Sequence, residues 1–182
     1  KSAALPWVFR CPVHGSDYQD MTGETLPVVL GAKRMATAEA PAKFGAAVLD
    51  AWVQGLGLGD LGPVEILALL TTRHRRASPP SLSEQPRMSL ETRRDYHEFL
   101  TTPIIRQALT VVVPEYDEVA PILTKPVRPG LFGLAQGSLL QALALTVGIG
   151  RVVENPVDQA ISILLKSDVD GQVRVRDTLA TW

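Results

Sequence analysis

A run of twenty residues without a charged side chain, from Leu131 to Gly150, constrains the fold of this chain more than any other feature. Twenty uncharged residues reach the length of a membrane-spanning helix. Polar side chains interrupt the run, however, and each glutamine among them would need a hydrogen-bond partner inside lipid. The interrupting residues are Gln136, Ser138, Gln141 and Thr146. We therefore predict no membrane span but a central helix that is buried on most of its faces.

The composition is that of one ordinary globular domain. The chain has 182 residues, of which 46% are hydrophobic and 20% are charged. That leaves enough apolar surface for a core and too little charge for a disordered chain. The formal net charge of -1 excludes a polycationic nucleic-acid wrapper and an acidic tail protein, but it allows a local basic patch. The one cysteine excludes an intrachain disulfide and an all-cysteine zinc site.

Three further helices are indicated by periodicity and by helix-start residues. Apolar residues at positions 44, 47, 48, 51 and 52 line one face of the first. The second opens at Pro63 and ends in the basic run 73–76, because proline suits a first turn and cations suit a last one. The segment 155–158 (Asn-Pro-Val-Asp) starts the third. This helix is predicted to bury residues 157, 160, 161, 164 and 165.

The remaining patterns predict shorter elements. Residues 89–100 and 103–109 have the pattern of short helices, and the β-branched run 110–113 predicts a strand. Val173 and Val175 alternate with arginines, which predicts a second strand with one apolar and one basic face. The predicted fold class is accordingly mainly α, with about five helices and a minor β component. An α+β fold is the alternative.

The sequence divides into an arm and a domain. Residues 1–35 have the proline-rich pattern of an extended N-terminal arm, and residues 36–182 that of a single helical domain with a mobile loop at 77–88. Three large apolar residues lie near the start of the arm, namely Leu5, Trp7 and Phe9. Such anchors near a free end are expected to pack on a neighbouring molecule. We therefore predict a homo-oligomer in which these three residues form the interface.

Arginines gather on both sides of the predicted loop. They are Arg73, Arg75, Arg76, Arg93 and Arg94. Because the guanidinium group matches the geometry of phosphate oxygens, these residues are predicted to contact nucleic acid. A basic helix end beside a loop is also the ordinary form of a solvated helix terminus, and that interpretation stays open.

Two segments match metal-binding motifs only in part. Cys11 and His14 have the Cys-x-x-His spacing of half a zinc site, but the sequence offers no second pair at short spacing. Residues 166–177 fit part of an EF-hand loop, yet Lys166 stands at the first ligand position, where its ammonium group would repel calcium. We predict neither a metal site nor a cofactor.

No motif in the sequence fixes a catalytic chemistry. Ser138, the one serine next to a glycine in the central helix, lacks the strand-to-helix turn of a serine nucleophile. We predict a non-catalytic structural or assembly protein, of the kind found in coats, nucleocapsids or scaffolds, that self-associates through its arm. The alternative is a small enzyme or ligand-binding domain with a pocket near residues 110–118, where Glu115 lies, and with His97, Asp117 and Glu118 as acid–base groups. No secretory signal is visible, so we expect a cytoplasmic or virion location.

Overall fold

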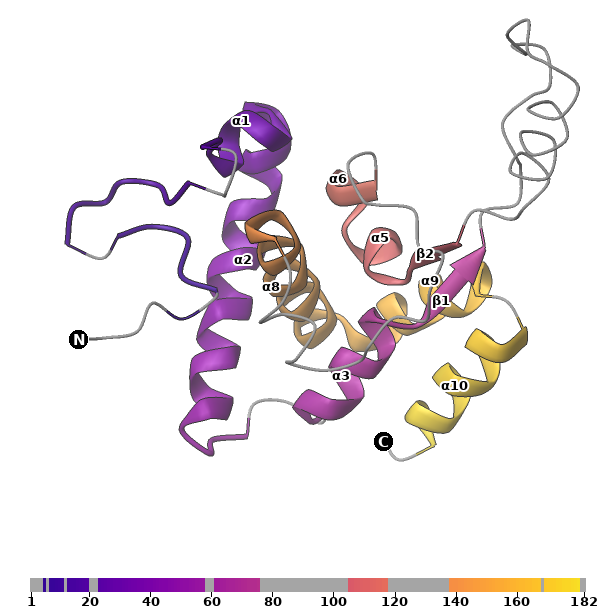
Figure 1. The fold of residues 1–182 in the computed structure, drawn as a ribbon. Coiled ribbons are helices and arrows are strands. Elements are labelled where there is room, and N and C mark those ends of the chain that lie inside the picture. Colours follow the sequence, from indigo (N-terminus) through magenta and orange to yellow (C-terminus); the bar gives the residue numbers. More distant parts are fainter. Residues whose placement is uncertain are drawn as a thin grey trace, which may run out of the picture.

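The computed structural model describes the chain apart from two long internal stretches and several short ones. The described residues are 5, 7–11, 13–19, 23–57, 61–75, 105–117, 138–167 and 169–180. Within them the fold is mainly helical, as predicted, and its β component is one antiparallel ribbon of two strands (Figure 1). The elements are α1 (Leu26–Leu30), α2 (Ala32–Val53), α3 (Pro63–Leu70), β1 (Arg73–Arg75), β2 (Ile105–Gln107), α5 (Leu109–Val112), α6 (Pro114–Asp117), α8 (Leu139–Glu154), α9 (Pro156–Lys166) and α10 (Val169–Leu179).

Helices α2 and α8 form the centre of the fold and pack directly against each other (Figure 1). The buried residues of α2 are mostly small and recur along one face, at positions 38, 42, 45 and 49. A side chain on Gly45 would run into the backbone of Thr146, and one on Gly150 into the backbone of Pro41. Glycine at these two positions therefore lets the two helix backbones approach within contact distance, which any larger residue would prevent.

Helix α8 is the predicted central helix. It begins at Leu139, where Ser138 accepts a hydrogen bond of 3.2 Å from the backbone N–H of Gln141 and so caps the helix. Every residue from Ala142 to Gly150 is buried, which confirms the predicted burial on most faces. The buried hydroxyl of Thr146 donates to the carbonyl of Leu143 at 2.7 Å. None of the described helices is both long and apolar enough to cross a membrane.

The extended arm predicted for residues 1–35 is wrong from residue 26 onward. Helix α1 occupies Leu26–Leu30 and α2 already begins at Ala32. Pro27 is compatible with a helix because it stands in the first turn, where no N–H is needed. Between the two helices, Gly31 has a φ of 76°, a left-handed conformation that glycine adopts without strain. Leu26 and Leu30 are both buried in the common core, which explains why this segment folds onto the domain.

Three predictions around the ribbon are also wrong. The basic run at 73–75 is strand β1 and not a helix end, because α3 stops at Leu70. Strand β2 replaces part of the helix predicted at 103–109, and it pairs with β1 so that Arg106 lies opposite His74. The β-branched run after it forms the short helix α5, whose Leu109 and Val112 are buried. Burial in the core has here outweighed the β propensity of the valines.

The strand predicted around Val173 and Val175 is helix α10 instead. Residues two apart lie on the same face of a strand but on nearly opposite faces of a helix. In agreement with the helix, Val175 is fully buried whereas Val173 is exposed.

The helix starts predicted at Pro63 and at residues 155–158 are confirmed, because α3 begins at Pro63 and α9 at Pro156. The loop predicted at 77–88 and the helix predicted at 89–100 lie outside the described residues.

Candidate functional site

Trp7 is anchored inside its own chain. Its side chain is only 6% exposed, and its indole Nε1 donates a hydrogen bond of 2.8 Å to Oδ1 of Asp50 on α2. The expectation that Trp7 packs on a neighbouring molecule is therefore wrong, because Trp7 belongs to the buried core of its own chain and Asp50 of α2 accepts its hydrogen bond. Phe9 is half-buried against the same core and Leu5 is exposed, so these two residues keep surface for a partner.

A groove with a volume of about 370 Å³ lies between the segment 7–10 and α2. Its walls are mostly apolar and include Met35, Ala42, Ala46 and Leu143. Glu39 lies within reach of both cations of the groove, at 3.1 Å from Nζ of Lys43 and 3.6 Å from Arg10. The volume is in the range of small-molecule sites. The larger space for the ligand-binding alternative thus lies along α2, and it shares one lining residue, Leu143, with the cavity beside the segment where that pocket was expected.

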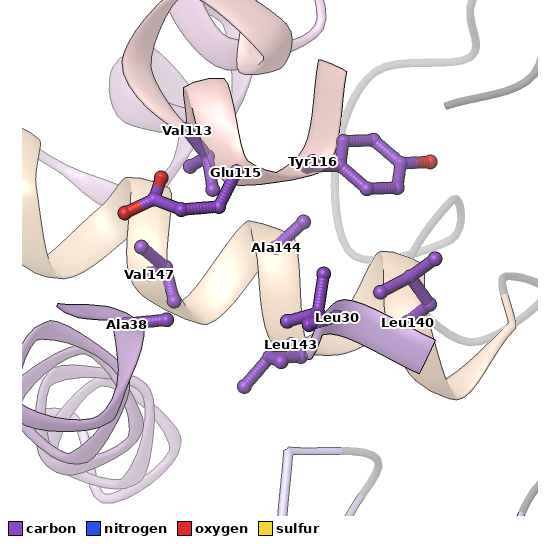
Figure 2. A pocket seen from close by; sticks show the side chains of 9 residues that line it. All are labelled: Leu30, Ala38, Val113, Glu115, Tyr116, Leu140, Leu143, Ala144 and Val147. Carbon is purple, nitrogen blue, oxygen red and sulfur yellow. The ribbon is translucent and has the colours of Figure 1, made fainter. Parts of the chain in front are cut away.

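The cavity next to residues 110–118 is much smaller. Its volume is about 10 Å³, which is room for one water molecule. Figure 2 shows Glu115 and Tyr116 above it, with Ala144 and Val147 of α8 beneath. The ring of Tyr116 and the carboxylate of Glu115 point in opposite directions from α6. Of the proposed acid–base groups, His97 and Glu118 lie outside the described residues, and Asp117 ends α6.

A polar cluster joins α2, α5, α6 and α8 beside this cavity. Pro41 has no N–H for the carbonyl of Thr37, which lies four residues earlier in α2. Nη2 of Arg151, from α8, approaches that carbonyl at 3.4 Å, and Nη1 of the same residue donates to the carbonyl of Val112 at 2.9 Å. The hydroxyl of Thr37 donates to Oε1 of Glu115 at 2.9 Å. Arg151 thus compensates for the proline and closes the C-terminal end of α5.

The centre of the cluster is an ion pair with two parallel hydrogen bonds. The guanidinium group of Arg151 donates to Oε1 of Glu115 at 2.6 Å and to Oε2 at 2.8 Å. Both side chains are largely buried, with 19% and 11% of their surface exposed. A buried ion pair with two parallel hydrogen bonds fixes the positions of α6 and α8 relative to each other. Both oxygens of the carboxylate accept hydrogen bonds from side chains of the same chain, so we interpret this cluster as structural.

The pKa of Glu115 is lower than its usual 4.5. Burial raises this pKa, but the hydrogen bonds from Arg151, from its own backbone and from Thr37, together with the charge of Arg151, outweigh the burial. The cluster therefore holds Glu115 in its ionised form.

Acid is expected to destabilise the folded protein through Glu115. The pKa of this group is depressed by folding, so its contribution is complete above the unfolded-state pKa and is lost as the pH falls through the folded-state value. Urea unfolding between pH 7 and pH 3 should show a steeper loss of stability for the natural chain than for Glu115→Gln, which carries no proton-linked group at this position. Equal slopes for the two proteins would contradict the prediction.

One face of α9 is apolar and open to solvent. Val157, Ile161 and Leu165 are spaced four residues apart and are 54%, 49% and 81% exposed. We call these three residues the α9 stripe. The prediction that they are buried is wrong, since the core receives Ala160 and Ile163 instead. Sequence periodicity alone could not choose between these two apolar faces of the same helix.

The Cys11–His14 pair lies on a turn that backbone hydrogen bonds close. The N–H of Cys11 donates to the carbonyl of Ser16 at 2.9 Å, and the N–H of Gly15 donates to the carbonyl of Cys11 at 2.8 Å. Gly15 follows with a φ of 67°, which favours glycine. This geometry places Sγ of Cys11 at 3.3 Å from Nδ1 of His14. The described part of the chain holds no group of three or more His, Cys, Asp and Glu side chains suited to a metal ion.

The structure brings only part of the predicted arginine cluster onto described elements. Arg73 and Arg75 are on β1, and β2 adds Arg106 opposite His74, which the sequence analysis did not include. Arg76, Arg93 and Arg94 lie outside the described residues.

Comparison with known proteins gives no relative: no family model, no curated protein and no solved structure matches this chain.

Proposed function

We propose that this chain is a non-catalytic structural or assembly protein that self-associates through the α9 stripe. The supporting observation is the exposed apolar face that Val157, Ile161 and Leu165 form on α9. Contiguous exposed apolar side chains commonly mark contacts between proteins. The proposal keeps the assembly function predicted from the sequence but transfers the main contact from Trp7 in the arm, which is buried in its own chain, to α9.

The occupant of this face is a second copy of the chain. The stripe is symmetric about its middle residue, because Val157 precedes Ile161 by four positions and Leu165 follows it by four. A twofold axis through Ile161 therefore brings Val157 of one copy against Leu165 of the partner subunit, and two antiparallel α9 helices present the same apolar surface to each other. Self-complementarity of this kind is what a twofold interface requires.

The charges along α9 favour the same antiparallel arrangement. Asp158 stands in the first turn and Glu154 just before it, whereas Lys166 ends the helix, and all three side chains are exposed. An antiparallel second copy places each lysine near the acidic end of the other helix, and a parallel copy would place like charges together. The helix dipoles also attract each other in this arrangement, because the positive end of each helix lies beside the negative end of the other.

The stripe is small, and this sets the expected strength of the association. The eight helical steps from Val157 to Leu165 span about 12 Å. A contact of that length, made by one helix face, buries less area than a standard stable interface, which buries about 800 Å² per partner. We therefore expect a concentration-dependent equilibrium between monomer and dimer.

Substitution of Val157 by aspartate should weaken dimerisation at least tenfold, because the twofold axis places the new charge in the interface twice. The matched control is Val64→Asp. Val64 also follows a proline in the first turn of its helix, α3, and is 73% exposed. Sedimentation velocity over a range of concentrations measures the equilibrium. The control should behave like the natural chain.

Equal dissociation constants for Val157→Asp and the natural chain would overturn the proposal, and so would a natural chain that stays monomeric at every concentration. Ile161→Asp gives a second test at the predicted axis. Circular dichroism of each variant separates loss of association from loss of folding.

Contact with nucleic acid stays a prediction. Arg106 stands opposite His74 in the ribbon of β1 and β2, so it lies on the other face from Arg73 and Arg75, and the three arginines do not form one basic face. For the ligand-binding alternative, the apolar groove along α2 offers more space than the cavity near residues 110–118.

A further inference from the structure

We propose that the groove between the segment 7–10 and α2 binds a long-chain primary amine, whose ammonium group pairs with Asp50 and whose aliphatic body lies over the alanines of α2. The groove and the α9 stripe are on different elements, so this inference does not rest on self-association. It assigns a class of ligand to a space that the proposed assembly function does not use.

The groove is long because the segment 7–10 runs antiparallel to α2. Trp7 contacts Asp50 near the C-terminal end of the helix, and Arg10 contacts Glu39 in its first half. The lining continues to Met35, and the fifteen helical steps from Met35 to Asp50 span about 22 Å. A volume of about 370 Å³ distributed along that length is narrow. The shape therefore fits a single linear chain better than a bulky ring system.

Small side chains on α2 leave the space for that chain. Ala42, Ala46 and Ala47 line the groove, and Phe9 and Leu143 add apolar surface to its walls. Methylene groups that leave water for such walls gain free energy in proportion to the area they bury. The walls therefore supply affinity for an aliphatic body, whatever its head group.

The outer wall of the groove is held in place without a ligand. The indole Nε1 of Trp7 donates to Oδ1 of Asp50 at 2.8 Å, and the N–H of Tyr18 donates to the carbonyl of Phe9 at 2.9 Å. These bonds tie the segment to α2 at one end and to the chain that follows it at the other. Such preorganisation lowers the ordering cost of binding.

The charges at the Arg10 end of the groove are already paired with each other. Arg10 is 2.6 Å from Oδ1 of Asp17 and 3.6 Å from Oε1 of Glu39, and Nζ of Lys43 is 3.1 Å from the same oxygen of Glu39. Two cations thus face two carboxylates. This end has no net charge, so it does not select the sign of a ligand.

Asp50 gives the groove its preference for a cation. Among the described residues its carboxylate meets one donor, the neutral indole N–H of Trp7, and no cation. That bond uses Oδ1, which leaves Oδ2 as an acceptor on a half-buried residue of the groove wall. An ammonium group would donate to the carboxylate in a charge-assisted hydrogen bond. It would also lie beside the indole ring of Trp7, and the faces of such rings attract cations.

The experiment compares three probes that differ only in the head group. Decylamine, decanol and decanoate are titrated into the full chain in a calorimeter at neutral pH, each below the concentration at which it aggregates. We expect one amine per chain, bound at least tenfold more tightly than the alcohol, because only the amine pairs with Asp50. Decanoate should bind more weakly than the alcohol, since Asp50 repels its carboxylate.

Variants at the two ends of the groove locate the ammonium group. Asp50→Asn keeps an oxygen that can accept the hydrogen bond of Trp7 but removes the charge. It should weaken amine binding at least tenfold and change decanol binding by no more than about twofold. Glu39→Gln is the matched control, because it removes the same charge from the same groove. Its carboxylate is eleven helical steps from Asp50, about 16 Å, which exceeds the screening length of about 8 Å. The preference for the amine should therefore persist in this control.

A third variant tests the apolar wall. Ala47→Leu fills the groove from an exposed position, so the fold should tolerate it, and circular dichroism checks this. The larger side chain should weaken the binding of amine and alcohol alike. Val157→Asp should bind the amine as the natural chain does, which keeps this site separate from the α9 stripe.

Four results would overturn the inference. The first is an amine that does not bind, or binds no more tightly than decanol. The second is a preference for decanoate, which would make Arg10 and Lys43 the site of an anion. The third is an amine preference that survives Asp50→Asn or is lost in Glu39→Gln. The fourth is unaltered binding in Ala47→Leu, which would place the ligand on another surface of the chain.

Discussion

Replacement of Arg151 by methionine is expected to lower the free energy of unfolding by about 3–5 kcal/mol. The change leaves the carboxylate of Glu115 largely buried without its cation, and it also removes the donors to the carbonyls of Val112 and Thr37. Because the whole domain is expected to be stable by only about 5–15 kcal/mol, this single loss is a large fraction of the total. Urea denaturation followed by circular dichroism measures it.

Two further variants make the result interpretable. Lys43→Met removes an exposed ion pair with Glu39 and should cost at most about 0.5 kcal/mol. The double variant Arg151→Met with Glu115→Leu should recover most of the loss, because no unpaired charge then remains in the interior. A cost for Arg151→Met that is as small as that for Lys43→Met would show that the cluster does not hold α2, α6 and α8 together.

Replacement of Gly45 by alanine is expected to cost about 3 kcal/mol or more, although only one methyl group is added. That methyl group would overlap the backbone carbonyl of Thr146, and a carbonyl in the middle of α8 cannot rotate away as a side-chain end can. Helices α2 and α8 would have to separate, and the core they share would lose its close packing. The melting temperature and the urea midpoint should both fall.

The matched control is Gly57→Ala. A Cβ atom at Gly57 meets no other atom within 4 Å, and the residue is exposed after the end of α2. Its substitution should leave the stability unchanged or raise it by up to about 1 kcal/mol, because alanine restricts the unfolded chain. Similar losses for the two variants would mean that the backbones of α2 and α8 do not touch at Gly45.

The Cys-x-x-His spacing drew attention to Cys11 and His14 without predicting a metal site, and the turn brings Sγ of Cys11 to 3.3 Å from Nδ1 of His14. The sequence identified Trp7 as a residue that packs into a dry contact, and its hydrogen bond to Asp50 shows that this contact is with α2 of its own chain. The partners Glu115 and Arg151 are 36 residues apart, so no local pattern could pair them.

The local sequence by itself determined where several helices begin and what lies at the centre. Pro63 and Pro156 act through their own backbone chemistry, and a long, mostly apolar run without charges favours burial. Only the tertiary structure decided that the valines of α5 and α10 are helical, which face of α9 meets the core, and that a proline is tolerated within α2. The physical reason is that these choices depend on burial against residues distant in the chain, and on a donor, Arg151, that α8 supplies.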